Sequence, residues 1–175
     1  MSQPKIIVRS AEDRDLNILQ TVAKNTFIDT YGTFNTPENM RAYLETHFSE
    51  KAIIAQLSDP EVQFFMAEQY NATIGYIKVN KGSAQTESNY PNTLEIERIY
   101  VISEFHGKGY GKLLLQKAKD VAKDDHLESV WLGVWDQNPK AIAFYERNGF
   151  STFGVHEFLL GDDPQRDYIM KFDLP

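Results

Sequence analysis

The chain has 175 residues, of which 42% are hydrophobic and 25% are charged, a balance that suits one folded domain over residues 1–175 and argues against disorder. It contains no cysteine, which excludes disulfides, thiolate metal sites and a cysteine nucleophile. The net charge of −7 disfavours a nucleic-acid partner and mildly favours a cationic substrate, although solubility alone accounts for such a charge.

The histidines His47, His106, His126 and His156 are widely spaced and form no ligand motif, so we expect no metal. Residues 1–10 show no basic segment followed by an apolar run, which is what a signal peptide requires. No apolar stretch approaches the roughly 20 residues that span a bilayer. We therefore expect a cytoplasmic protein without a membrane partner.

The first half of the chain combines strand and helix signals. Apolar residues at helical spacing follow two helix starts, Ala11-Glu12-Asp13 and Thr36-Pro37-Glu38. The predicted order is a strand at 6–8, helices beginning at 11 and 36, a helix at 49–57, and a hairpin of strands at 62–68 and 73–79.

The second half begins with a strong strand at residues 93–102. Simple alternation places Leu94, Ile96, Arg98, Tyr100 and Ile102 on one face, and Glu95, Glu97, Ile99 and Val101 on the other. The elements after it are a glycine-rich turn at 107–111, a helix at 112–125, a strand at 129–135, a helix at 141–147, and strands at 150–159 and 167–172 joined by the turn Gly161-Asp162-Asp163-Pro164. One mixed α/β domain is the economical interpretation.

A loop rich in glycine stands between the strand at 93–102 and the helix at 112–125. It reads His106-Gly107-Lys108-Gly109-Tyr110-Gly111-Lys112. Successive amide N–H groups of such a loop can converge on an anion, and the following helix adds the positive end of its dipole. Lys108 and Lys112 add charge at the rim. A tight turn that merely requires glycine is the alternative, because the spacing matches neither the dinucleotide motif nor the P-loop.

A second motif follows in the order Asn138-Pro139-Lys140-Ala141-Ile142-Ala143-Phe144-Tyr145-Glu146-Arg147-Asn148-Gly149-Phe150. The two motifs together resemble the GCN5-related N-acetyltransferase (GNAT) family, whose loop reads Gln/Arg-x-x-Gly-x-Gly/Ala. His106 stands at the Gln/Arg position, so we expect a weakened contact from that side chain. The motifs cover roughly residues 93–155, and residues 94–101 and 131–136 look like the PaiA-like branch of polyamine N-acetyltransferases.

This resemblance implies an α/β GNAT fold with a mostly antiparallel, twisted sheet of about seven strands flanked by helices. It implies acetyl-coenzyme A (acetyl-CoA) as cosubstrate, no metal, and direct transfer of the acetyl group to an amine. Tyr145 matches the family's tyrosine and would act as general acid to the leaving thiolate, unless it is a core tyrosine. Glu97 is the candidate general base, and a partner for Arg98 or Lys78 is its alternative role.

The resemblance also implies which residues bind the cofactor. Backbone groups of Ile99, Tyr100 and Val101 would meet the pantetheine arm, and the loop amides would hold the pyrophosphate. Asn138 would bind the arm, cap its helix, or do both. The predicted cofactor-binding set is Ile99, Tyr100, Val101, His106, Gly107, Lys108, Gly109, Tyr110, Gly111, Lys112, Asn138, Lys140, Tyr145 and Arg147.

The acceptor is expected to be a small primary amine, with a polyamine such as spermidine or spermine as the leading hypothesis. Protein amino termini, lysine, aminoglycosides and amino acids are alternative acceptors, and a regulatory acyl-CoA-binding module without turnover is the alternative class. The chain would act as a monomer or a homodimer. Aromatic candidates for the acceptor cleft are Tyr31, Phe34, Tyr43, Phe48, Tyr90, Trp135 and Phe158.

Overall fold

One twisted sheet organises the chain. The structure is a computed structural model that describes residues 5–175, so part of the segment inspected for a signal peptide, residues 1–4, lies outside the described residues. Within residues 5–175 the strand order is β1-β2-β3-β4-β5-β7-β6. Within that range the contact of β4 with β5 is parallel, and all other neighbours are antiparallel. The expected mostly antiparallel sheet of about seven strands flanked by helices is confirmed.

The strands of the sheet are β1 (Ile6–Ser10), β2 (Val62–Gln69), β3 (Ala72–Asn80), β4 (Thr93–Val101), β5 (Ser129–Trp135), β6 (Ser151–Leu160) and β7 (Asp163–Asp173). The helices are α1 (Leu16–Tyr31), α2 (Pro37–Phe48), α3 (Glu50–Ser58), α4 (Tyr110–Asp124) and α5 (Pro139–Arg147). Their starts follow local capping chemistry. The hydroxyl of Thr36 accepts a hydrogen bond from the Asn39 amide, and the hydroxyl of Ser49 accepts one from the Ala52 amide.

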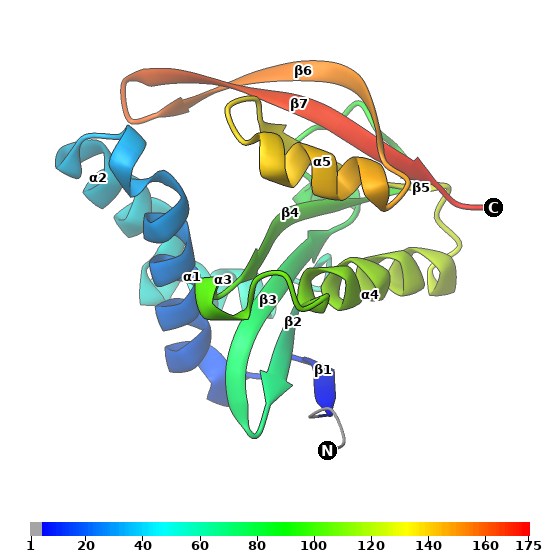
Figure 1. Cartoon of the computed structure of the whole chain (residues 1–175), viewed down its shortest axis with the longest axis horizontal. Coiled ribbons are helices and arrows are strands. Elements are labelled where there is room, and N and C mark those ends of the chain that lie inside the picture. Colours follow the sequence, from blue (N-terminus) through cyan, green and yellow to red (C-terminus); the bar gives the residue numbers. More distant parts are fainter. Residues whose placement is uncertain (1–4) are drawn as a thin grey trace.

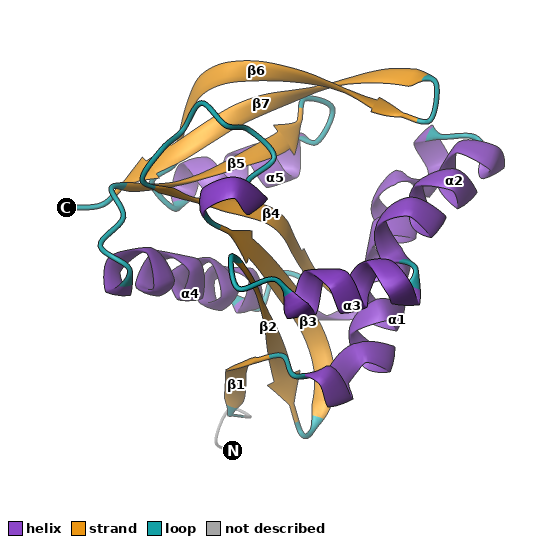
Figure 2. Ribbon diagram, turned by 180° about the vertical axis from the view of Figure 1, so that it is seen from behind, coloured by secondary structure: helices purple, strands orange, loops and turns teal. Residues whose placement is uncertain are grey.

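Helices cover both faces of the sheet (Figures 1 and 2). On one face, α1, α2 and α3 pack over the central strands in a cluster that includes Leu19, Phe48 and Tyr76. On the other face, α4 and α5 pack in a second cluster that includes Leu115 and Tyr145. Two hydrophobic cores therefore lie on opposite sides of the sheet, and any opening between strands connects the two sides.

A β-bulge in β4 changes which residues share a face. Lys78 pairs with Arg98 and Val79 pairs with Ile96, so Glu97 is an extra residue without a direct partner on β3. After the bulge, Ile99 packs in the same core cluster as Ile96. The prediction from simple alternation is therefore wrong beyond Ile96, because one inserted residue exchanges the two faces of a strand.

The bulge divides the remaining side chains of this segment between the two cores. Val101 joins Ile99 and Leu94 on the α4 side of the sheet. Tyr100 and Ile102 pack on the side of α1, α2 and α3. The end of β4 thus has an aliphatic surface toward α4 and an aromatic surface toward α1.

Among the predicted boundaries that differ from the structure, two concern the start of α4 and the start of β7. Helix α4 begins at Tyr110, because Gly109 supplies the left-handed residue at its amino end, so Gly111 and Lys112 are helical. Strand β7 begins at Asp163, within the predicted turn. Pro164 is tolerated there because β7 pairs with β5 only from Asp167 onward, which leaves the proline without a partner on that side.

Adjacent leucines on α4 test this packing. Leu114 is fully buried, whereas Leu113 is 44% exposed. We expect Leu114→Ala to lower the free energy of unfolding by about 2–5 kcal/mol, because it removes core contacts and leaves a cavity. Leu113→Ala on the same helix is the control and should cost much less. Urea denaturation of both variants measures the difference, and equal losses would contradict the assigned helix face.

Candidate active site

A cleft opens where β4 and β5 separate. Their parallel pairing ends at Ile96 and Leu132, after four residue pairs. Beyond that point β4 continues on β3 as far as Val101, and β5 continues on β7 as far as Trp135. The two strands therefore expose facing edges, and residues 97–101 and 133–135 line a cleft of about 970 Å³. Unpaired strand edges offer backbone N–H and C=O groups to a bound chain.

The glycine loop closes one end of the cleft. Gly107 and Gly109 adopt positive φ angles of 74° and 82°, and a Cβ added at either position would have no atom within 4 Å. The loop backbone is thus open to solvent and leads directly into α4. The first amides of a helix have no partner within the helix, so those at the start of α4 are available to an anion.

The side chains of the loop have separate contacts. The imidazole Nε2 of His106 lies 2.6 Å from the carbonyl oxygen of Val101, which ties the loop to the end of β4. The ammonium of Lys108 lies 5.0 Å from the Phe105 ring centre, and the Tyr110 hydroxyl accepts a hydrogen bond of 3.0 Å from Gln69. His106 and Tyr110 line the cleft, whereas Lys108 is not among its lining residues.

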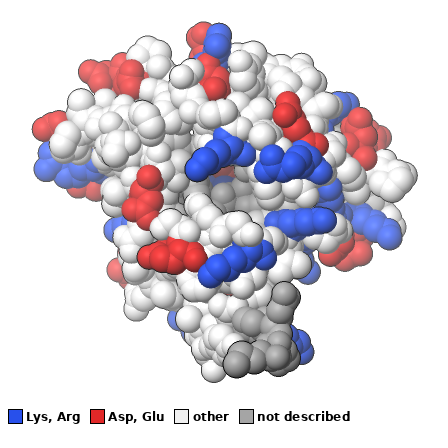
Figure 3. All heavy atoms as spheres, viewed as in Figure 1, with Lys and Arg blue, Asp and Glu red and all other residues white. Residues whose placement is uncertain are grey.

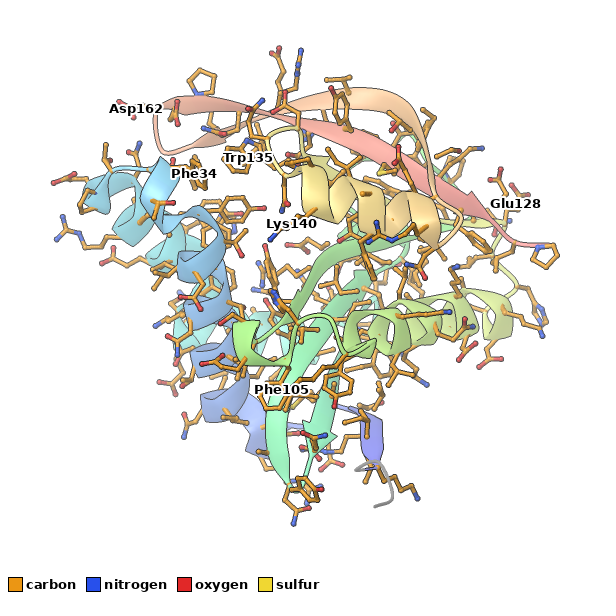
Figure 4. All side chains as sticks on the ribbon, in the orientation of Figure 1. Phe34, Phe105, Glu128, Trp135, Lys140 and Asp162 are labelled. Atoms are coloured by element: carbon orange, nitrogen blue, oxygen red, sulfur yellow. The ribbon has the colours of Figure 1, made fainter. Side chains whose placement is uncertain are left out.

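Basic side chains gather on the rim of the cleft. Figure 3 shows a hollow in this face with Lys and Arg side chains around it. Lys112 from α4 and Lys140 and Arg147 from α5 line the cleft. Figure 4 shows Lys140 extending from α5 toward the open centre of the molecule. These three cations, together with the loop amides, form a surface suited to a ligand with several phosphates.

Helix α5 places Asn138 and Tyr145 on the same side of the cleft. The side-chain oxygen of Asn138 accepts a hydrogen bond of 3.2 Å from the Ala141 amide, so the predicted helix cap is confirmed. The Tyr145 ring packs beside Phe144 and Phe150, with centroids 5.3 and 5.9 Å apart. Burial raises the pKa of the Tyr145 hydroxyl above its ordinary value. Tyr145 therefore keeps its proton at neutral pH.

Glu97, the bulged residue, lies in an ionic cluster. Its carboxylate pairs with the ammonium of Lys78, accepts a hydrogen bond of 2.7 Å from the side-chain Nδ2 of Asn80, and lies 3.2 Å from the Arg98 guanidinium. Burial acts to raise the pKa of Glu97, but the Arg98 and Lys78 charges outweigh it and lower this pKa. The structure thus supplies the ion-pair role that the sequence left as the alternative, and a base role for Glu97 stays a prediction.

Aromatic side chains form the wall of the cleft opposite α4. The Trp135 ring contacts Tyr31 and Phe34, with centroids 5.7 and 4.9 Å away, and Figure 4 shows Phe34 beside Trp135. Of the aromatic residues named from the sequence, those that line the cleft are Tyr31, Phe34, Tyr43, Trp135 and Phe158.

Two of the predicted aromatic candidates are wrong. Phe48 is fully buried beneath the Arg98 guanidinium, which lies 4.3 Å from its ring centre. Tyr90 packs against Trp131 and Phe153 instead. Helical spacing places Phe48 on the apolar face of its helix, but it does not show whether the side chain lines the cleft or is buried in the core.

Among the polar cleft residues that the sequence missed, His156 on β6 and Gln165 and Asp167 on β7 all lie on the last hairpin. Burial raises the pKa of Asp167 to about 6, Asp136 acts in the same direction, and His156 acts against it. Polar residues at alternate positions are common in hairpins at the edge of a sheet, so this pattern does not indicate a site. These residues reach the cleft because β7 pairs with β5. That pairing belongs to the tertiary structure and leaves no signal in the sequence.

The geometry defines a class of protein with an open gap between two strands, flanked by amides and cations that suit a phosphate-bearing ligand. The family model for the acetyltransferase (GNAT) family matches residues 25–150. The chain belongs to this family, and it is an acetyl-CoA-dependent N-acetyltransferase. The open strand edges, the loop amides and the three rim cations fit coenzyme A.

Individual relatives agree with this assignment. The chain is 35% identical over 171 residues, 98% of either protein, to an uncharacterized N-acetyltransferase in the pepI 3′ region of Lactobacillus delbrueckii subsp. lactis. It is 26% identical over 151 residues, 84% of the chain and 89% of the relative, to a spermidine N(1)-acetyltransferase of Thermoplasma acidophilum. A PaiA N-acetyltransferase of Thermoplasma acidophilum, solved with coenzyme A, superposes with a TM-score of 0.81 at 24% identity, over 97% of this chain and 99% of that one.

No helix within residues 5–175 is long and apolar enough to cross a membrane. No group of three or more His, Cys, Asp or Glu in that range could hold a metal ion.

Two glycines test the loop conformation. Gly109→Ala places a Cβ on left-handed backbone and should lower the free energy of unfolding by about 1–2 kcal/mol, although no atom blocks the new methyl group. Gly32→Ala is the matched control, because Gly32 is helical with a φ of −60°. It should be neutral or raise stability by about 0.4–1 kcal/mol. Thermal unfolding of both variants measures this, and an unchanged Gly109→Ala protein would rule out the left-handed start of α4.

Proposed function

We propose that this acetyltransferase transfers acetyl groups directly to a primary amine of polyamine type. The observation that carries the proposal is the division of charge along the cleft. The wall formed by α4 and α5 is basic, whereas Asp29 from α1 and Asp167 from β7 line the cleft from other elements. An anionic donor and a cationic acceptor would therefore enter from different sides and meet in the gap between β4 and β5.

The aromatic wall supports an extended cationic acceptor. Ring faces attract ammonium groups, and their apolar area suits the methylene segments between them. Trp135 contacts both Tyr31 and Phe34, and it pairs across the sheet with Asp167. A polyamine combines both features along its length. The relative named as a spermidine N(1)-acetyltransferase supports the same substrate class.

The chemistry would need three contributions from the chain. Backbone groups of Ile99, Tyr100 and Val101 would hold the pantetheine arm and the thioester carbonyl beside the open edge of β4. The amides at Gly107–Lys112 and the cations Lys112, Lys140 and Arg147 would hold the phosphates. His106 would fix the loop through Val101 rather than bind the anion itself, and Lys108 would contribute charge only at long range.

Tyr145 would supply the proton that the leaving thiolate requires. Its pKa is raised by burial, so it is protonated, and its place on α5 keeps it beside the gap. After the amine attacks the carbonyl carbon, the C–S bond breaks and the tyrosine O–H donates to sulfur. The proton lost by the acetylated nitrogen then restores the tyrosine.

An acceptor screen tests the proposed function. Thiol release from acetyl-CoA should depend on the amine, and spermidine should give a higher kcat/KM than a simple monoamine. This advantage should shrink as salt rises, because the attraction between separated charges is screened. The panel also contains a lysine peptide, a peptide with a free amino terminus, an aminoglycoside and free amino acids. A preference for one of these would replace the polyamine, and binding of acetyl-CoA without release for any amine would indicate a regulatory module.

Substitution of Tyr145 tests the proton donor. Tyr145→Phe should lower kcat by about 10²-fold, because the thiolate then leaves without a positioned acid. The dissociation constant for coenzyme A should stay within twofold, as calorimetry can show. Tyr70→Phe is the control, because Tyr70 is 80% exposed and lies in the turn between β2 and β3. Unchanged turnover in Tyr145→Phe would remove Tyr145 from this role.

A further inference from the structure

A carboxylate on β7 lies at the point where β4 and β5 separate. Asp167 pairs with Trp135 of β5 and with His156 of β6. Its side chain extends over Gly133, and a Cβ added to Gly133 would lie 3.0 Å from the Asp167 Oδ2 atom. Gly133 directly follows Leu132, the last residue of β5 that pairs with β4. The carboxylate therefore occupies space that a side chain at position 133 would fill.

Gly133 is also where β5 opens to the cleft. It is the exposed residue of a strand whose other residues are buried. Asp167 and Gly133 both line the cleft, on the side that carries Trp135 and Phe158. Because Gly133 has no side chain, the Asp167 carboxylate has a short path to the gap between β4 and β5. In the proposed function this gap holds the thioester.

Asp167 differs in its partners from Glu95 and Glu97, the other acidic groups of the cleft that are at least partly buried, whereas Asp29 is exposed. Within residues 5–175 it has no hydrogen bond or ion pair to a side chain, and burial dominates its environment. Glu97 is held by Lys78, Asn80 and Arg98. Glu95 accepts hydrogen bonds from Thr86 and Asn80. A half-buried carboxylate without a protein partner carries a desolvation cost, which a cationic ligand would offset.

The groups that face Asp167 do not neutralise it. Tyr31 of α1 and Tyr43 of α2 lie near enough for its charge to act on them. His156 on β6 is 3.0 Å from Glu87, and Asp136 after β5 is paired at 2.8 Å with Arg166. The nearby histidine and the nearby arginine thus each have another carboxylate partner.

We propose that Asp167 is the acceptor carboxylate, which binds the ammonium group of the amine and removes the proton that blocks its attack. This inference rests on the proposed function, because it requires an amine acceptor. It assigns to Asp167 the role that the sequence suggested for Glu97. Glu97 instead neutralises Lys78 and Arg98, and so fixes the bulge that turns Ile99 and Val101 toward the cofactor side.

The proton transfers balance in two steps. The ammonium gives one proton to the Asp167 carboxylate, and the neutral amine forms the new C–N bond as the C–S bond breaks. The nitrogen loses a second proton, and the departing sulfur gains one through Tyr145. Asp167 then releases its proton to solvent at the mouth of the cleft. A carboxyl with a pKa of about 6 is a stronger base than an ordinary aspartate and is still ionised at neutral pH.

The pH dependence of Asp167→Asn tests the inference. For spermidine, wild-type kcat/KM should rise through an acidic limb with an apparent pKa near 6 and then level off. At pH 7 the variant should lose about 10²-fold, because only the small neutral fraction of the amine can react. Its kcat/KM should instead keep rising with pH toward the pKa of the amine. Asp173→Asn, which removes the same charge at the far, exposed end of β7, is the control and should behave as wild type.

A weakly basic primary amine, already neutral at pH 7, gives a second readout. It needs no base, so Asp167→Asn should acetylate it at a rate within a few fold of wild type. A general structural defect would instead lower the rates with both amines. The affinity for coenzyme A should be unchanged, since the carboxylate lies on the acceptor side.

Stability gives a readout that does not depend on activity. Folding raises the pKa of Asp167 from 3.8 to about 6, so the folded state binds this proton more tightly than the unfolded state does. The ionised carboxylate therefore costs stability as pH rises through 6. Asp167→Asn should be at least as stable as wild type at pH 8, and any advantage should shrink toward pH 4. A variant that is less stable at pH 8 would contradict the unpartnered carboxylate.

The outcomes separate the two proposals. No turnover of any amine by wild type, with coenzyme A still bound, overturns the proposed function itself. Turnover that is unchanged in Asp167→Asn overturns only the role of Asp167. An acidic limb that persists in Asp167→Asn and disappears in Glu97→Gln would return the base role to Glu97.

Discussion

The separation of β4 from β5 is the constraint on which the rest of the site depends. Two parallel strands that pair over four residues and then diverge leave their facing edges unpaired. Each strand stays in the sheet through its other neighbour, β4 through β3 and β5 through β7. The opening therefore costs few backbone hydrogen bonds, and a bound chain can satisfy those groups.

The bulge at Glu97 and the ionic cluster around it help to set this opening. One extra residue turns Ile99 toward α4 and Tyr100 toward α1, so the end of β4 presents different surfaces to the two sides of the gap. Lys78 and Arg98 are buried charges that require a counter-charge, and Glu97 provides it. The ion pairs of Glu97 therefore stabilise this part of β4, a structural role that its position in the sequence could not separate from a catalytic one.

In the proposed function, the two faces of the sheet bind different substrates. Helices α4 and α5 bring amides and cations to the proposed cofactor side, whereas α1, α2 and the β6–β7 hairpin bring aromatic rings and carboxylates to the proposed acceptor side. The hairpin reaches α2, where Asn39 donates a hydrogen bond of 3.0 Å to Asp162. This contact joins distant segments beside the proposed acceptor side, and in Figure 1 the hairpin arches over α5 toward α2.

The sequence by itself determined the family, the glycine loop at the start of α4, the order of most elements and the place of Tyr145 on α5. These depend on local signals, since glycine spacing, helix caps and an ordered pair of motifs lie within short stretches of chain. Only the tertiary structure decided the phase of β4 after Glu97, the burial of Phe48 and the position of Asp167 over Gly133. Each of these depends on which strand lies beside which, and a one-residue bulge or a distant hairpin leaves no periodic trace in the sequence.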